Sequence, residues 1–184
     1  MERSGARRVT RVTHLGDLAG GPCPVEIDAV VVSPNVVTSP MSGLRAALIE
    51  LDVREHVADG LGDEGTSLGT VVLGDLLTLR TADGFEVLLV ARRVQLLFVL
   101  LAAQSVALSQ MLPEIVPLLT RSKGKGVLGY RENALSEGDE VRLRAVVEAV
   151  PASRFGTPEE VPHHCVVRDD LAPVVLQQLG SRLR

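Results

Sequence analysis

A regular alternation of apolar and charged residues in the last third of the chain constrains the fold most strongly. Val141, Leu143, Ala145 and Val147 occupy every second position, and Arg142 and Arg144 stand between them. Successive side chains of a β-strand point to opposite faces, so this pattern indicates a strand with one buried face and one wet face. The sequence therefore predicts a β-rich fold built around this segment.

The residues just before this strand predict a turn and a second strand. Gly138 supplies the positive φ that tight turns use, and Asp139 can bond its own backbone. Residues 130–132 are expected to form a strand that folds back on residues 141–148. The whole segment is therefore predicted to be a hairpin.

The same criteria predict strands elsewhere in the chain. Further strands are expected at residues 24–32, 36–38, 44–56 and 163–168. The segment 44–56 would also tolerate a helix, but its alternation favours a strand. Two apolar runs, 70–80 and 85–91, flank Asp83 and Gly84, and Asp-Gly between such runs is a strong hairpin signal. A Gly/Asp loop is expected over 58–69.

The most apolar segment, 94–108, is too short for a membrane span, which needs roughly 20 residues. A buried pair of strands and a single core helix remain alternatives for it. Short helices are predicted over 112–121, where Pro113 suits a first turn, and over 171–183. We therefore expect no membrane-spanning segment.

These elements predict a mainly β fold, a barrel or sandwich of the OB type with one or two short helices. An α+β fold is the alternative. Residues 1–22 are expected to be an N-terminal tail, 23–150 the β-rich domain, and 151–184 a C-terminal extension with a strand and a short helix.

Composition narrows the function classes. The chain is 46% hydrophobic but only 2% aromatic, and its formal net charge is −4. The core must therefore be Val, Leu and Ala, and nothing attracts the whole chain to nucleic acid or to an anionic membrane. The basic N-terminus has no apolar core like that of a secretory signal. A bridge between Cys23 and Cys165 is one interpretation, and a reduced cytoplasmic pair is favoured.

A serine-hydrolase motif occurs at residues 65–69, Gly-Thr-Ser-Leu-Gly. It would make Ser67 a nucleophile, with a base such as His163. The motif requires a strand before it and a helix after it, whereas a loop precedes it here and an apolar run follows. A plain Gly-rich loop is therefore favoured.

The densest group of metal-ligating residue types includes His163 and Cys165, which would share one face of a strand. Cys23 and His14 are the further candidates, and a structural zinc ion needs four ligands. The basic loop 122–126 lacks the spacing of a phosphate-binding loop. We therefore predict no metal, no cofactor and no nucleic-acid partner.

Three short motifs resemble the GIDE-type (BAM) domain, best known beside the membrane in a mitochondrial RING ubiquitin ligase and also found in bacterial proteins. The residues that carry the resemblance are Ser39, Pro40 and Gly43 of an SPxxG-like turn, Asp83 and Gly84 of an acidic-Gly hairpin, and Tyr130, Arg131, Glu132, Gly138 and Asp139 of a "YRE…GD" ending. The match covers about residues 24–150. It implies a β-barrel-like interaction module.

The sequence departs from this family at functional positions. Leu44, Arg45 and Ala46 stand where the family usually has a Cys and aromatic residues. Two Cys cannot supply the ligands of a RING finger. The ligase activity is therefore not implied.

The function expected from the sequence is that of a non-catalytic, cytoplasmic interaction or scaffold domain of the β-barrel type with a protein partner. A position beside a membrane or within a larger assembly is compatible with it, and an enzyme is less favoured. One alternative is a barrel whose Val- and Leu-lined interior binds a small apolar ligand. Another is a hydrolase that uses Ser67. The apolar segment 94–108 also leaves a homo-oligomer open.

Overall fold

The computed structural model describes residues 10–11, 15, 21–57, 65–98, 106–107, 113, 115–122, 126–149 and 164–180. Strands make up most of these residues. The helical elements with described bounds are α1 (Val116–Leu119) and the 3-10 turn η2 (Ala91–Arg93). The predicted mainly β fold is confirmed.

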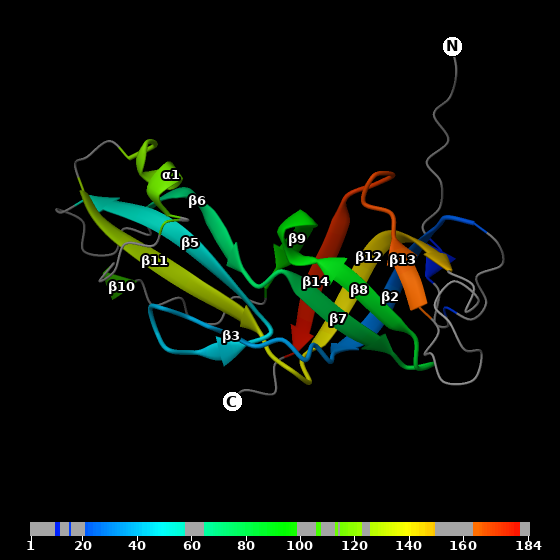
Figure 1. The fold of residues 1–184 in the computed structure, drawn as a ribbon. Helices are drawn as coiled ribbons and strands as arrows, with labels where there is room; N and C mark the ends of the chain where they lie inside the picture. Colours follow the sequence, from blue (N-terminus) through cyan, green and yellow to red (C-terminus); the bar gives the residue numbers. More distant parts are fainter. Residues whose placement is uncertain are drawn as a thin grey trace, which may run out of the picture.

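Five strands form a closed ring of hydrogen-bonded pairs (Figure 1). They are β2 (Cys23–Val31), β7 (Leu76–Thr81), β8 (Glu86–Val90), β13 (His164–Val167) and β12 (Glu140–Ala149). β2 pairs with β7, β7 with β8, β8 with β13, and β13 with β12, which returns to β2. Only the β8–β13 pair is parallel. A small closed barrel with this connectivity is of the OB type.

On the β12 side of the ring, two more strands extend the barrel sheet. β14 (Val174–Gly180) lies antiparallel to β12, and β9 (Val94–Leu97) lies parallel to β14. The predicted helix over 171–183 is wrong, because alternate side chains of β14 are buried against the barrel. Strands β13 and β14 both fall within the segment expected to be a C-terminal extension.

A second sheet is made by the two segments that leave the barrel sheet, one between β2 and β7 and the other between β9 and β12. Its strands are β10 (Val106–Ala107), β11 (Gly126–Leu135), β5 (Leu48–Val57) and β6 (Thr66–Leu73). β11 pairs with β5 along all of its 10 residues. We call this sheet and α1 the inserted lobe, which stands to the left of the barrel in Figure 1.

A small third sheet precedes the inserted lobe. β3 (Val37–Thr38) pairs antiparallel with β4 (Arg45–Ala46). β4 and β5 confirm the strand interpretation of residues 44–56. The predicted loop over 58–69 is too long, because β6 already begins at Thr66.

The predicted hairpin between residues 130–132 and 141–148 is wrong. The turn itself forms: Gly138 has φ 87°, and the N–H of Asp139 donates to the Ser136 carbonyl at 3.1 Å. However, β11 pairs with β5, whereas β12 pairs with β2. The turn therefore carries the chain from the inserted lobe into the barrel.

Gly74 makes the opposite crossing. The apolar run 70–80, predicted as one element, divides there into β6 of the inserted lobe and β7 of the barrel. Gly74 has φ 107°, and an added Cβ would lie 3.0 Å from the Ala47 carbonyl oxygen. Only Gly fits this crossing without strain. The next turn matches the prediction, since β7 and β8 form the hairpin around Asp83 and Gly84.

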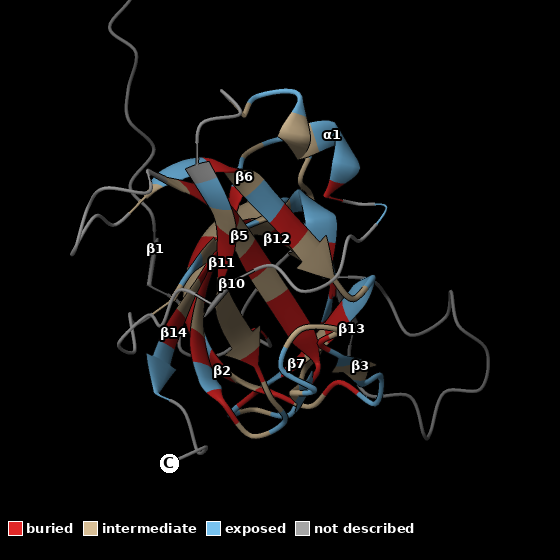
Figure 2. Cartoon of the chain, turned by 90° about the vertical axis from the view of Figure 1, so that its left-hand side faces the viewer, coloured by how far each residue is buried: buried red, intermediate tan, exposed pale blue. Residues whose placement is uncertain are grey.

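The buried faces follow the predicted alternation. Val141, Leu143 and Val147 are 0% exposed, while Arg142 and Arg144 point away from the barrel interior. Figure 2 shows the same alternation of buried and intermediate residues along β5. A separate apolar cluster, around Ile49, Leu51, Val53, Tyr130 and Ile115, forms the core of the inserted lobe.

Part of the predicted N-terminal tail joins the barrel. β1 (Thr10–Arg11) lies parallel to β2, and Leu15 is buried in the barrel core. The Leu15 N–H donates to Asp83 Oδ2 at 2.7 Å, so the tail is fastened to the β7–β8 turn.

The segment 94–108 contains strands β9 and β10, and its residues 99–105 lie outside the described residues. The linker 151–162 and the basic residues 123–125 also lie outside them. Among the helices that the structure describes, none has the length and apolar character needed to span a membrane.

Candidate interaction surface

Three exposed apolar side chains lie together on the outer face of the β7–β8 hairpin. Leu76, Leu88 and Val90 are 39%, 52% and 36% exposed. Leu76 is directly opposite Val90 in the register, and Leu88 is on the same face of β8 as Val90. We call these three residues the apolar patch. A cluster of this kind on a barrel exterior marks a binding surface more often than a scattered single residue does.

A groove opens beside the apolar patch where two neighbouring strands are interrupted. The β8–β13 pairing ends at Leu88 and Val166, and the β9–β14 pairing begins at Val94 and Val174. Between them, η2 interrupts one strand and a turn interrupts the other. The groove has a volume of about 230 Å³ and is lined by Leu88, Leu89, Val90, Arg93, Val94, Val167, Asp169 and Val174.

Charged groups stand at one side of this groove. Arg93 Nη1 donates to Asp169 Oδ2 at 2.8 Å, and this hydrogen bond raises the pKa of Arg93. Arg168 donates to Asp170 and holds the pKa of that carboxyl below its ordinary value. The carboxylates of Asp169 and Asp170 are thus both engaged by arginines.

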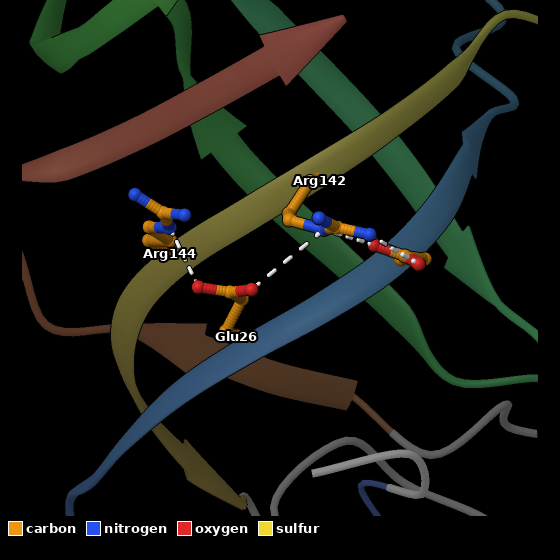
Figure 3. Close-up of polar contacts among 4 residues, drawn as sticks. Glu26, Arg142 and Arg144 are labelled. Atoms are coloured by element: carbon orange, nitrogen blue, oxygen red, sulfur yellow. Dashed lines mark hydrogen bonds and ion pairs between the residues drawn. The ribbon is translucent and has the colours of Figure 1, made fainter. Parts of the chain in front are cut away.

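The opposite wall of the barrel has a different chemistry (Figure 3). Arg142 Nε donates to Asp28 Oδ1 at 2.6 Å, and Arg144 Nε donates to Glu26 Oε2 at 2.6 Å. Glu26 also lies 3.8 Å from Arg142 Nε. Because each arginine faces a carboxylate across β2 and β12, this wall offers no unpaired basic stripe to a nucleic-acid backbone.

The structure joins two of the sequence motifs. Ser39 Oγ donates to Glu132 Oε2 at 2.6 Å, and Ser42 Oγ donates to Glu132 Oε1 at 2.7 Å. The N–H groups of Met41 and Ser42 donate to Ser39 Oγ. The turn through Pro40 and Gly43 is therefore fixed to β11 by hydrogen bonds, and the role of these motif residues is structural.

The Gly-Asp turn also ties elements together. Asp139 is buried, and its carboxylate accepts hydrogen bonds from the Ser136 N–H at 2.9 Å and from Gln178 Nε2 at 3.3 Å. The N–H of Gly138 donates to the Val31 carbonyl at 2.8 Å. Asp139 thus connects the ends of β2, β11 and β14.

Tyr130 and Arg131 differ in their surroundings. Tyr130 is buried in the inserted lobe, and burial, with the nearby charge of Glu132, raises its pKa. Arg131 stands opposite Asp52 in the β11–β5 register, and its Nε is buried with no hydrogen-bond partner among the described residues. Neither residue lies near the groove.

Ser67 does not stand on a hydrolase elbow. It lies within β6, and its Oγ donates to Asp52 Oδ1 at 2.6 Å. Arg54 Nε donates to the other oxygen of Asp52 at 2.6 Å. The partner base that the sequence offered, His163, lies outside the described residues.

The two cysteines lie on strands that flank β12. Cys23 is opposite Val147, and Cys165 is opposite Ala149. Two strand spacings amount to roughly 9.5 Å, which exceeds the Cα separation that a disulfide spans. Within the ranges that the structure describes, no group of three His, Cys, Asp or Glu residues could hold a metal ion. His14 and His163 are outside those ranges.

The sequence reasoning missed the apolar patch. Its signal is the run from Val87 to Val90, which is apolar at every position. Apolar and polar residues alternate along a strand that has one solvent-exposed face. Leu88 and Val90 depart from this alternation, because they are apolar at positions where polar residues are expected.

No family model, curated protein or solved structure matches this chain.

Proposed function

We propose that this chain is a non-catalytic interaction domain that binds a protein partner through the apolar patch and the adjacent groove. The observation that carries the proposal is the exposure of Leu88 and Val90 beside Leu76 on paired strands. Of the other exposed large hydrophobic side chains of the described residues, Leu97 and Leu179 lie on the paired strands β9 and β14, and the rest lie on separate elements. The rest are Val36, Val116, Val127 and Leu171.

The position of the apolar patch adds a fold-level analogy. OB-type barrels commonly bind their ligands on the face of the second and third barrel strands, which here are β7 and β8. Fold alone does not fix a ligand, but the chemistry of this face distinguishes between classes. Apolar side chains gain free energy when a protein surface covers them, at about 25 cal/mol per Å² buried.

Nucleic acid fits this face poorly. Barrels that bind single strands use aromatic side chains on which bases stack. Phe85 and Phe98 are partly buried against the barrel core, and Tyr130 is buried in the inserted lobe. The described part of the β7–β8 outer face therefore has no stacking platform.

The resemblance to GIDE-type domains supports the same class of function. Its SPxxG-like turn and its "YRE" strand contact each other through Ser39 and Glu132. The resemblance remains a proposal.

Of the alternatives, an internal ligand site is less favoured, because side chains such as Leu79 and Leu143 fill the barrel interior. A hydrolase is less favoured because Ser67 is paired with Asp52 inside a strand.

A cytoplasmic location is part of this proposal, and the free thiol of Cys23 supports it. A second copy of the chain is the alternative partner for the apolar patch. Sedimentation velocity separates the two cases, because a homodimer held by this surface would dissociate in the Leu88→Lys variant.

The experiment is a quantitative affinity purification with three baits: the wild type, Leu88→Lys and the matched control Val127→Lys. Val127 is 57% exposed and lies on β11 in the inserted lobe. We expect a partner that the wild type and Val127→Lys retain equally and that Leu88→Lys loses at least about tenfold, or 1.4 kcal/mol. Equal retention by all three baits would refute the proposal.

A further inference from the structure

We propose that the part of the N-terminal segment that joins the barrel is a displaceable strap, which fills a peptide-binding site in cis. The described residues of the strap are Thr10, Arg11 and Leu15. The acceptor site is made by one edge of β2 and by the β7–β8 turn, at the end of that hairpin away from the apolar patch. When the strap leaves, the same site binds a matching peptide in trans. The inference does not depend on the proposed function.

One edge of β2 is the backbone part of the acceptor site. A strand has two edges, and β12 pairs with one edge of β2 from Cys23 to Val30. On the other edge, β7 pairs only with residues 29–31. β1 pairs with Val25 and Glu26, which are also paired with β12, so it lies on this second edge. Without the strap the edge would be uncovered here, and an uncovered strand edge is a template for pairing with another segment.

Leu15 is the apolar anchor of the strap. Its side chain is 1% exposed and packs in the barrel core, whose other buried members all come from Val25 onward in the sequence. When such a side chain is withdrawn, the core around it closes only in part and leaves an apolar hollow. The barrel core therefore contains a place for one Leu-sized side chain from a segment outside the closed ring of strands.

Asp83 gives the acceptor site a polar contact that its own hairpin holds in place. Its Oδ2 accepts the Leu15 N–H at 2.7 Å, and its Oδ1 accepts the Thr81 hydroxyl. Thr81 is buried, and its oxygen also accepts the Phe85 N–H at 3.1 Å. Because the β7–β8 turn orients this carboxylate, the acceptor remains in position for another N–H group when the strap leaves, and binding costs little ordering.

The described contacts of the strap are few compared with those of the ring strands. β1 pairs with two residues of β2, whereas β12 pairs with eight. The strap adds the Leu15 side chain and its hydrogen bond to Asp83. Segments held in this way open locally at a lower free energy than the whole fold. The strap can therefore exchange with a competing peptide while the ring stays closed.

The ligand of the acceptor site is a peptide with the pattern of the strap itself. It needs two consecutive backbone positions that pair with β2, and a Leu-sized side chain four positions after the second, as Leu15 follows Arg11. A peptide with the sequence of residues 8–18 has this pattern and serves as the probe. In the wild type the closed strap competes with it, so the contact is autoinhibitory.

The binding test uses full-length chains and the fluorescein-labelled probe peptide. Leu15→Asp releases the strap, because burying an unpaired carboxylate is costly. Val127→Asp is the matched control at an exposed site on β11. Fluorescence polarisation should show at least about tenfold tighter binding to Leu15→Asp than to the wild type or to Val127→Asp, since a closed strap lowers the apparent affinity by the fraction of open chains. A probe that itself carries Leu15→Asp should not bind.

Two results of the binding test would overturn the inference. One is equal binding of the probe to all three chains. The other is an absence of binding to a Leu15→Asp chain whose far-ultraviolet circular dichroism matches that of the wild type. Both results would leave the proposed function standing, because Leu88 is not part of the acceptor site.

Hydrogen exchange of the wild type tests the strap without any substitution. The Leu15 amide should exchange at least about tenfold faster than the Leu143 amide after correction for intrinsic rates, and low concentrations of urea should not change its rate, because local opening exposes little surface. A Leu15 amide that exchanges only with global unfolding of the barrel would overturn the inference, even if Leu15→Asp fails to fold.

Discussion

The Ser39 hydroxyl donates a 2.6 Å hydrogen bond to the Glu132 carboxylate, across a sequence separation of 93 residues. Ser39 is buried, and its oxygen also accepts the N–H groups of Met41 and Ser42. One carboxylate on β11 thereby orders the turn between β3 and β4. This contact gives the two motifs a structural role that can be measured.

Replacing Glu132 with Ala should lower the free energy of unfolding by about 1.5–3 kcal/mol, because a hydrogen bond to a charged group is lost and the buried Ser39 hydroxyl loses its acceptor. Urea unfolding followed by circular dichroism measures the change. Ser42→Ala is the matched control, since its bond to the same carboxylate is exposed. A loss in Ser42→Ala as large as that in Glu132→Ala would contradict the buried contact as the source.

Substitutions on the buried face of β12 should lower the free energy of unfolding more than substitutions on its exposed face. Leu143→Ala removes a fully buried side chain and should cost about 2–5 kcal/mol. The neighbouring change, Arg144→Ala, removes an exposed ion pair with Glu26 and should cost less than about 1 kcal/mol. Chemical denaturation of both variants compares the two faces of β12 directly, and similar losses would mean that the strand is not oriented as described.

The buried carboxylate of Asp139 should contribute more to the free energy of unfolding than the exposed side chain of the next residue, Glu140. Asp139→Ala removes the acceptor for the Ser136 N–H and for Gln178, so we expect a loss of about 1–3 kcal/mol. Glu140→Ala changes an exposed residue at the start of β12 and should stay within about 0.5 kcal/mol. Thermal unfolding of the two variants under identical conditions provides the comparison. An unchanged Tm for Asp139→Ala would argue against its bridging role.

Glu50 predicts a pH dependence of stability. Burial raises its pKa above the ordinary value of 4.5, and the charge of Asp52 adds to this, although a hydrogen bond from Asn133 lowers it. The folded state therefore holds this proton to higher pH than the unfolded state, so the Glu50 contribution to stability falls as pH rises from 4.5 through the raised pKa. At neutral pH the ionised, half-buried carboxylate is destabilising.

The isosteric change Glu50→Gln should therefore raise the free energy of unfolding at pH 7, by about 0.5–1 kcal/mol. The advantage should fade as the pH is lowered well below 4.5, where the wild-type carboxyl is protonated in both states. Urea titrations of both proteins at a series of pH values measure this difference. An advantage that is constant with pH would show that ionisation of Glu50 is not its cause.

Local sequence patterns predicted which residues form strands better than they predicted which strands pair with each other. Val141 and Leu143 face inward because period-2 alternation is a property of the strand itself. Strand partners depend on distant residues, so the turn at Gly138 suggested a hairpin where the chain changes sheets. The crossing at Gly74 could not be predicted for the same reason, because an apolar run has the same sequence pattern whether it lies in one sheet or is divided between two.

The C-terminal strand and the apolar patch show two further limits. β14 was expected to be a helix, because over so short a segment its apolar residues fit the period of a helix as well as that of a strand. The patch depends on which face of β8 remains uncovered, and an unbroken run from Val87 to Val90 suits a fully buried strand equally well. The groove arises only when interruptions in β8–β9 and in β13–β14 fall side by side, and no local pattern encodes that coincidence.

The most direct test of the central claim is site-specific photo-crosslinking in living cells, with a photoreactive phenylalanine at position 88 in one variant and at position 127 in another. Both positions are exposed, one in the apolar patch and one in the inserted lobe. The account predicts a discrete crosslinked protein from position 88 and none from position 127. No adduct at position 88, or the same adduct from both positions, would contradict a docking surface on β7 and β8.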